Sequence, residues 1–329
     1  MMKTLYITRS GKLVRRQNTI VIIDKKGKRY SYPVENIEDI HTFSHLTVTS
    51  ATFKFLSKRR IPLHFYDYYG NYIGTFHPKE YIVSGFTLVN QVKHYYTHPE
   101  RLFLAKNILL GALKSMKKTL SDFHVEASKL ELYKSPIENA KNIQQLMGVE
   151  GTLRNLYLSI LDTLIENPTF HLGKRSRRPP ANYGNALMSY LNSVVYGTTL
   201  TQIYHTHLDP RVGYLHETGY RRFPLSLDIS EIFKPLIADR LLITLVNSGE
   251  IKKGHFIPGS RGILLSTYGK KRLLQNYDDL INQTFYHPRS HRKVSLKRLI
   301  RMEVYRIEKH IIGDETYSPS TISDILNFD

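Results

Sequence analysis

Between Lys3 and about Phe76 the chain alternates short apolar and polar runs, and turn residues separate them. Runs such as Leu5–Thr8 and Thr19–Ile23 have the length and the period of two that are typical of strands in β-hairpins. Ser50–Leu56 differs, because its spacing is that of a short helix. The pattern predicts a small N-terminal β-rich domain over residues 1–80.

Past Pro78 the apolar positions recur at helical spacing. The first clear stripe consists of Leu102, Ala105, Leu109 and Leu113. Further helices are expected at about 137–166, 184–203, 226–247, 270–284 and 294–312. We therefore predict an α+β protein, in which the β-rich domain is followed by a larger all-α domain over residues 81–329.

Charge and cysteine content narrow the function. Forty-seven Lys and Arg against 28 Asp and Glu give a formal net charge of +19, which favours a polyanionic partner such as nucleic acid. An anionic membrane surface or plain solubility are the alternatives. The absence of cysteine excludes disulfides, thiolate zinc sites and cysteine nucleophiles. A metal ion would therefore need oxygen or imidazole ligands.

Targeting signals are not apparent in the sequence. The first twenty residues carry five Lys and Arg without an apolar stretch of signal-peptide length, and no later apolar run approaches the ~18 residues of a membrane span. We expect a cytoplasmic protein with no membrane partner.

A glutamate interrupts the apolar stripe of the helix expected at 137–166. Glu150 falls in the core-facing phase, where an unpaired charge costs several kcal/mol, so it should have a cation, a metal or a hydrogen-bond network beside it. Gly148 and Gly151 flank it, which suggests that something approaches this backbone closely. The alternative is an ion pair with a core arginine such as Arg154 or Arg240.

Asp228 and Glu231 are three residues apart and share one face of a predicted helix. Two carboxylates at this spacing suit Mg²⁺ or Mn²⁺, which prefer oxygen ligands. The same pair also fits a capping box, with Asp228 as the N-cap and Glu231 bonding back to its amide. From the local pattern alone, the capping box is favoured.

His216 follows a loop with turn signals and precedes this acid pair. One imidazole beside carboxylates suits Mn²⁺ or Mg²⁺ better than zinc. A different class of enzyme, a zinc hydrolase, would combine His205, His207 and His216 in one site. Measuring stoichiometric zinc in the purified protein would support that class.

Two basic segments could contact phosphate. Arg177 and Arg178 end the run that starts at Lys174, and a second cluster without acids lies between 289 and 301. The alternative is that these residues lie on solvated loop and helix faces.

Several segments have the order and spacing of one known family, the CRISPR-associated spacer-acquisition integrases, which are metal-dependent DNA endonucleases. The chain resembles this family in Gly148–Gly151, Arg177–Pro180 with Asn185–Tyr190, Leu208–His216 and Ser226–Pro235. The β-rich half is similar to the family's N-terminal domain in Leu46–Leu56 and Arg60–Asp67. The resemblance thus covers nearly the whole chain.

The resemblance implies that the all-α domain is catalytic, with Glu150, His216 and Glu231 as ligands of Mg²⁺ or Mn²⁺. It makes Asp228 a further catalytic acid and Lys234 a phosphate contact. The implied reaction inserts foreign DNA fragments into a repeat array by attack of a 3′-hydroxyl on a phosphodiester. A non-catalytic DNA-binding scaffold of the same fold is the rival hypothesis.

The resemblance also implies partners. Besides double-stranded and branched DNA, these are a second copy of the chain in a homodimer and a small ferredoxin-like CRISPR adaptation protein. The apolar alternations of residues 1–80 have little predicted helical cover, which independently suggests that this domain pairs with its counterpart in another chain.

Overall fold

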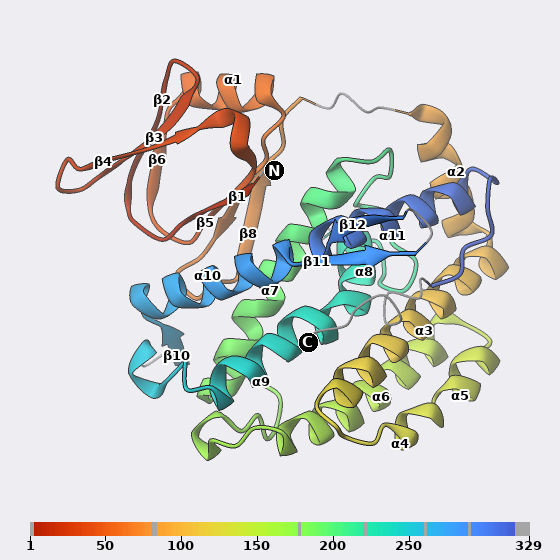
Figure 1. The fold of residues 1–329 in the computed structure, drawn as a ribbon. Helices are drawn as coiled ribbons and strands as arrows, with labels where there is room; N and C mark the ends of the chain where they lie inside the picture. The colour runs from red at the N-terminus through yellow and green to blue at the C-terminus, as the bar shows by residue number, and fades with distance from the viewer. Residues whose placement is uncertain are drawn as a thin grey trace.

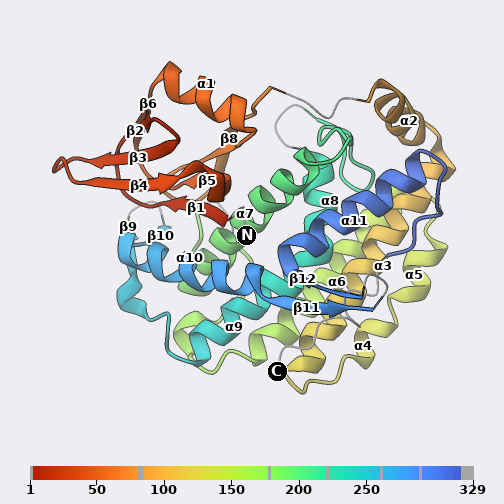
Figure 2. The same cartoon turned by 45° about the horizontal axis from the view of Figure 1, so that its top comes forward.

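The computed structural model describes residues 3–79, 84–176, 179–219, 223–259, 262–288 and 291–319. A strand-rich part at the N-terminus sits at one end of a larger helical body (Figures 1 and 2). Among the described residues, no helix combines the length and apolar character needed to cross a membrane. The predicted fold class, a β-rich start followed by a mostly helical body, is confirmed.

The strand-rich part contains two four-stranded sheets, ordered β1-β5-β7-β8 and β4-β3-β2-β6. Its elements are β1 (Lys3–Ile7), β2 (Gly11–Arg16), β3 (Thr19–Asp24), β4 (Arg29–Pro33), β5 (Ile37–Thr42), β6 (Leu46–Val48), α1 (Ser50–Arg59), β7 (Leu63–Tyr66) and β8 (Tyr72–Phe76). The hairpin prediction holds for β2-β3, β3-β4 and β7-β8, which pair antiparallel. It is wrong for β1, which pairs in parallel with β5, a strand about thirty residues further along the chain.

The helical body surrounds α7, most of whose residues are buried. Its helices are α2 (Gly85–Tyr96), α3 (His98–Asp122), α4 (Ser128–Glu131), α5 (Lys134–Asn139), α6 (Ile143–Thr163), α7 (Tyr183–Tyr204), α8 (Pro224–Lys234), α9 (Arg240–Asn247), α10 (Thr267–Asn282) and α11 (Leu296–Ile311). Two short hairpins were not predicted and interrupt this helical part: β9 (Phe256–Gly259) with β10 (Gly262–Leu265), and β11 (Thr284–His287) with β12 (Arg292–Ser295).

The single helix expected at 226–247 is interrupted. After α8 ends at Lys234, a π-helical segment, Pro235–Asp239, leads into α9. Pro235 is the physical cause, because proline has no amide hydrogen and its ring displaces the carbonyl four residues earlier, which is that of Glu231. The backbone is thus altered beside one of the predicted site residues.

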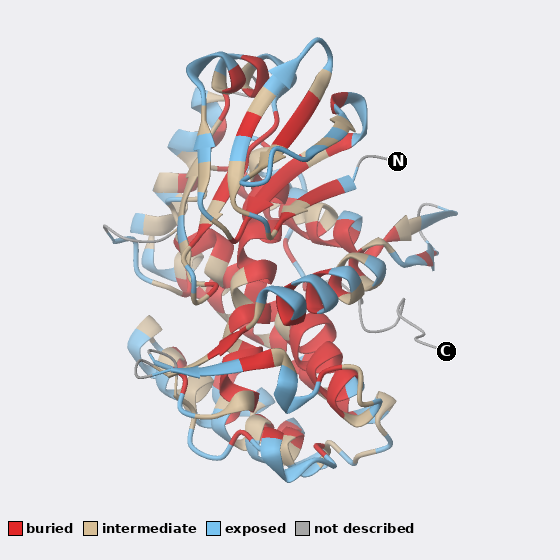
Figure 3. Cartoon of the chain, turned by 90° about the vertical axis from the view of Figure 1, so that its left-hand side faces the viewer, coloured by how far each residue is buried: buried red, intermediate tan, exposed pale blue. Residues whose placement is uncertain are grey.

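The first sheet contacts α7 closely, and Figure 3 shows buried residues where the strand-rich part meets the helices. At Gly197 on α7, a Cβ atom would lie 2.0 Å from the Tyr66 hydroxyl and 3.0 Å from the His41 ring, so only glycine lets these elements approach. The buried residues of the two parts meet here, since Phe43 and Tyr66 of the strand-rich part belong to the core of the helical body. The sheet is therefore firmly seated on the helices.

Buried charges also join the two parts. On α11, Lys297 places its ammonium 2.7 Å from a Glu38 oxygen and 3.6 Å from Asp39, and donates a hydrogen bond to Thr4 on β1. Arg301 pairs with Glu38 as well. Burial raises the pKa of Asp39, but the charges of Lys297 and His41 outweigh it and hold that pKa well below its usual value.

We expect Lys297→Met to lower the free energy of unfolding by about 3 kcal/mol, because the buried Asp39 would lose the charge of the lysine ammonium. The neighbouring Arg298 is exposed, so Arg298→Met should change this free energy by less than about 0.5 kcal/mol. Urea denaturation of the two variants measures the difference. Equal midpoints would show that the junction does not depend on this cation.

Candidate metal centre

Asp228 lies in the second turn of α8 and is completely buried. One carboxylate oxygen accepts the backbone N–H groups of Tyr214 and Leu215, at 2.6 and 3.0 Å. The other accepts the N–H of His216 at 2.9 Å and lies 2.7 Å from its ring atom Nδ1. Because α8 begins at Pro224 after the N-cap Phe223, Asp228 does not cap it, and the capping-box interpretation is wrong.

His216 owes its orientation to this carboxylate. Burial lowers the pKa of the imidazole, but the hydrogen bond and charge of Asp228 outweigh burial, so its pKa is raised above the usual value. When the ring is neutral, the proton on Nδ1 faces Asp228 and the lone pair on Nε2 is available to a metal ion. Histidine ligands in metal sites are held in this way by a carboxylate behind them.

Glu231 follows on α8 and is almost fully buried. Its carboxylate pairs with the ammonium of Lys234, one turn along the helix. Burial raises the pKa of Glu231, but the nearby charges of Lys234 and Arg154 outweigh it and lower that pKa to about 2. Glu231 is therefore an anion throughout the physiological range.

Glu150 lies near the middle of α6 and is partly buried. Burial raises its pKa, and the negative charge of Glu231 raises it further, while the lowering effect of His216 is smaller. This mutual influence means that the three side chains face the same region. Their donor atoms do not all lie within 4.8 Å of one another, so closing on one ion requires side-chain rotation.

The ion-pair interpretation of Glu150 is wrong. Arg154 instead bonds Asp239 at 3.1 Å, and Arg240 pairs with Asp122. Within the part of the chain that the structure describes, Glu150 has no hydrogen-bond or ion-pair partner. Two carboxylates with one imidazole match the oxygen-rich donor set of Mg²⁺ or Mn²⁺.

Gly148 and Gly151, on either side of Glu150, have open space where a side chain would stand. No described atom lies within 4 Å of a Cβ built at either residue. The sequence suggested that something approaches this backbone, and within the described chain nothing does. The face of α6 that carries Gly148 and Gly151 is thus open, and Glu150 lies on a different side of the helix.

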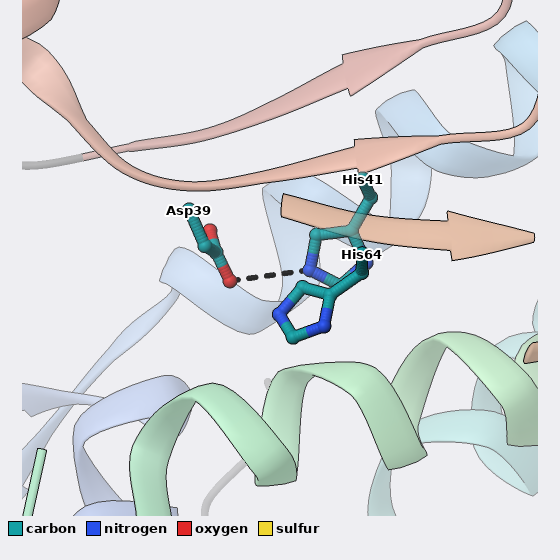
Figure 4. Close-up of side chains that lie close together, drawn as sticks. All are labelled: Asp39, His41 and His64. Carbon is teal, nitrogen blue, oxygen red and sulfur yellow. Dashed lines mark hydrogen bonds and ion pairs between the residues drawn. The ribbon is translucent and has the colours of Figure 1, made fainter. Parts of the chain in front are cut away.

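A second group of potential ligands, Asp39, His41 and His64, is fully buried at the junction with α7, and its donor atoms lie within 4.8 Å (Figure 4). Each imidazole nitrogen already has a partner: His41 contacts Tyr66 and Asp39, and His64 contacts Thr75 and Thr201. The ammonium of Lys297 is also close to Asp39. These contacts make the group a structural network rather than a metal site.

A third group combines His94, Glu100 and His310. The Nδ1 atom of His310 accepts the backbone N–H of Tyr317 at 3.3 Å. In the neutral ring Nε2 then carries the proton and has no lone pair to offer a metal. This group also fits a metal poorly.

The three-histidine zinc site is not formed. His207 bonds Glu308 at 2.5 Å and His205 lies 3.8 Å from Glu38, whereas His216 is held by Asp228. These three histidines are not among the described groups whose donor atoms converge.

The predicted DNA contacts Arg177 and Arg178 lie outside the described residues. Nearby, Arg175 donates hydrogen bonds to the side chains of Asn185 and Ser189. The sequence did not lead us to predict that Arg154 pairs with Asp239. The only signal was a basic residue one helical turn after Glu150.

Known proteins resemble this chain over nearly its whole length. The model of a family described as CRISPR associated protein Cas1 matches residues 5–279. A relative from Thermotoga maritima named CRISPR-associated endonuclease Cas1 is 42% identical over 316 residues, covering 96% of this chain and 99% of the relative.

Solved structures share the fold of this chain. A Cas1 protein from Thermotoga maritima superposes with a TM-score of 0.91 at 42% identity, covering 97% of this chain and all of that one. A casposase bound to integration product gives a TM-score of 0.87 at 18% identity, covering 96% of this chain and 92% of that one, and shares the fold. The fold defines the class of protein, which has a strand-rich N-terminal part followed by a larger helical body. The chain belongs to the CRISPR associated protein Cas1 family.

Proposed function

We propose that the chain is a metal-dependent DNA endonuclease and integrase of CRISPR adaptation, which inserts foreign DNA fragments into a repeat array in the cytoplasm. The observation that carries the proposal is the group of Glu150, His216 and Glu231, in which the partly buried Glu150 makes no ion pair with any described residue. Family membership supports it, since the Thermotoga maritima relative is named an endonuclease.

Each side chain of the site has a distinct task. Glu150, His216 and Glu231 would hold Mg²⁺ or Mn²⁺, and Asp228 keeps the Nε2 lone pair of His216 directed at it. A divalent cation bound there neutralises charge that develops as a DNA 3′-hydroxyl, or water, attacks a phosphodiester. The attack forms one phosphorus–oxygen bond and breaks another, so the same site serves both joining and cutting. Lys234 adds an ammonium group for phosphate contact.

The charge of the chain and the open face of α6 support DNA as the substrate. A net charge of +19 favours the phosphate backbone, and the absence of side chains at Gly148 and Gly151 leaves room for a strand along α6. Arg177 and Arg178 complete the proposed contacts.

Partners form a further part of the proposal. We infer a domain boundary near residue 80. We also infer that the strand-rich part forms a homodimer, and that a small ferredoxin-like CRISPR protein binds this homodimer. The strand β4 is an edge of its sheet, which supports pairing with another chain. Light scattering at micromolar concentration tests the dimer, and a monomer mass would contradict it.

A strand-transfer assay tests the function. Purified protein is mixed with short DNA duplexes and a supercoiled plasmid that carries a repeat, with Mg²⁺, with Mn²⁺ or with a chelator. We expect joined products with either metal and none with chelator. DNA binding without any joining or cutting in either metal would instead favour the scaffold hypothesis.

A further inference from the structure

The segment that carries His216 is an irregular loop between α7 and α8. A ligand on such a loop is useful only if the backbone beneath it is fixed, because metal sites lose affinity when a ligand drifts. Asp228 fixes residues 214–216 of this loop through their backbone N–H groups. The question is what fixes the preceding residues, 209–213.

Gln91 on α2 fixes residues 209–212 of the loop by hydrogen bonds. Its side chain is completely buried, and its amide nitrogen donates to the carbonyl oxygens of Asp209 and Val212, at 2.9 and 3.0 Å. Its amide oxygen accepts the backbone N–H of Asp209 at 2.8 Å. One side chain thus satisfies three backbone groups of a loop that lies about 120 residues further along the chain.

Only an amide of this length meets these requirements. Two donors and one acceptor are needed at one place, and the reverse orientation of the amide would direct its oxygen at two carbonyls. A carboxylate would repel both carbonyls. An apolar side chain would leave the N–H of Asp209 and the carbonyl of Val212 without this partner, and the carbonyl of Asp209 would keep only the N–H of Val212, at 3.3 Å. The contacts therefore define both the residue type and its orientation.

The loop is tightly packed between the residues that Gln91 fixes and those that Asp228 fixes. Gly213 stands between them, and a Cβ atom there would lie 2.7 Å from Pro224 and 3.0 Å from the carboxylate of Asp228. From α3, Arg101 donates to the carbonyl oxygen of Tyr214 at 3.0 Å. A shift of the loop at residues 209–212 would consequently move the backbone that presents His216.

We propose that Gln91 is a positioning residue of the metal centre, which acts by fixing the loop that presents His216. It does not touch the metal or the DNA. The inference rests on the proposed function in one respect, namely that His216 binds a metal. The fixing of the loop itself can be tested without any metal.

The test compares Gln91→Met with Asn90→Met, the adjacent residue of α2. Among the described residues, the side chain of Asn90 bonds only the carbonyl oxygen of Phe86 in its own helix, so its variant controls for changes to α2 that leave the loop contacts intact. Two quantities are measured on the full chain: hydrogen exchange of loop amides 209–216 without metal, and the dissociation constant for Mn²⁺ by calorimetry. If Gln91→Met does not purify in folded form, Gln91→Asn replaces it, with the same amide on a shorter stem.

We expect at least about tenfold faster exchange in the loop and about tenfold weaker Mn²⁺ binding for Gln91→Met, with both unchanged for Asn90→Met. DNA binding in chelator should stay as in the parent protein. Parent-like exchange, or faster exchange with parent-like Mn²⁺ affinity, would overturn the inference. If the parent protein binds no Mn²⁺, the proposed metal site fails, and the exchange rates alone decide whether Gln91 fixes the loop.

Discussion

Glu150→Gln is expected to reduce strand transfer by about 100-fold or more while the metal-free protein stays folded. The substitution removes an anionic oxygen donor and nearly preserves side-chain volume. Glu150 has no cationic partner among the described residues, so no buried cation is left unpaired when its charge is removed. Mn²⁺ affinity should fall together with activity, whereas DNA binding in chelator should persist.

The stability of this variant has a definite sign. Burial and the charge of Glu231 raise the pKa of Glu150, so the folded protein holds this proton more tightly than the unfolded chain does. Ionisation at neutral pH therefore opposes folding, and Gln removes that penalty. The melting temperature of metal-free Glu150→Gln at pH 7 should equal or exceed that of the parent. The advantage should disappear below about pH 4.5, where the glutamate is protonated in both states.

Exposed Glu166, just beyond the end of α6, provides the matched control. Glu166→Gln should leave activity, metal affinity and melting temperature unchanged. Thermal melts in chelator and strand transfer with Mn²⁺ are measured for both variants. A clearly destabilised Glu150→Gln that still joins DNA would remove Glu150 from the catalytic site.

Local pattern was sufficient for much of the fold. The helical stripe through Leu102 and Leu109 became α3, and the period-two runs became strands, because burial of one face is encoded in nearby residues. The parallel pairing of β1 with β5 could not be predicted, since it depends on contacts between distant segments. The break at Pro235 was visible in the sequence, but the apolar stripe continues through it and concealed the change in helix type.

In the candidate site, too, the sequence pattern indicated unusual residues but did not predict their contacts with distant segments. The position of Glu150 in an apolar stripe indicated an unusual environment, and the structure bears out that it is partly buried with a raised pKa. The i, i+3 spacing of Asp228 and Glu231 suggested equivalent roles. In the fold they differ, because Asp228 faces the backbone of the loop 214–216 and Glu231 faces Lys234. The partner of each carboxylate is set by tertiary packing, which spacing does not report.

Asp228 should therefore respond to substitution differently from Glu150. Each of its two oxygens accepts two contacts, from the backbone of Tyr214 and Leu215 on one side and from the backbone and ring of His216 on the other. In Asp228→Asn one oxygen becomes an NH₂ group. That donor then faces the two backbone N–H groups of Tyr214 and Leu215, or the backbone N–H and the ring Nδ1 of His216. The loop then loses the hydrogen bonds to one of the two carboxylate oxygens, and the buried N–H groups on that side have no acceptor.

We expect Asp228→Asn to weaken Mn²⁺ binding by about 10- to 100-fold and also to lower the stability of the metal-free protein by about 1 to 3 kcal/mol. Asp279→Asn on the exposed face of α10 is the control, with neither effect. Calorimetric titration and urea denaturation measure the two quantities. The joint loss distinguishes a residue that positions His216 from a proposed ligand such as Glu150, whose replacement is expected to lower metal affinity alone. If Asp228→Asn kept its full stability and lost only metal binding, Asp228 would itself be a ligand.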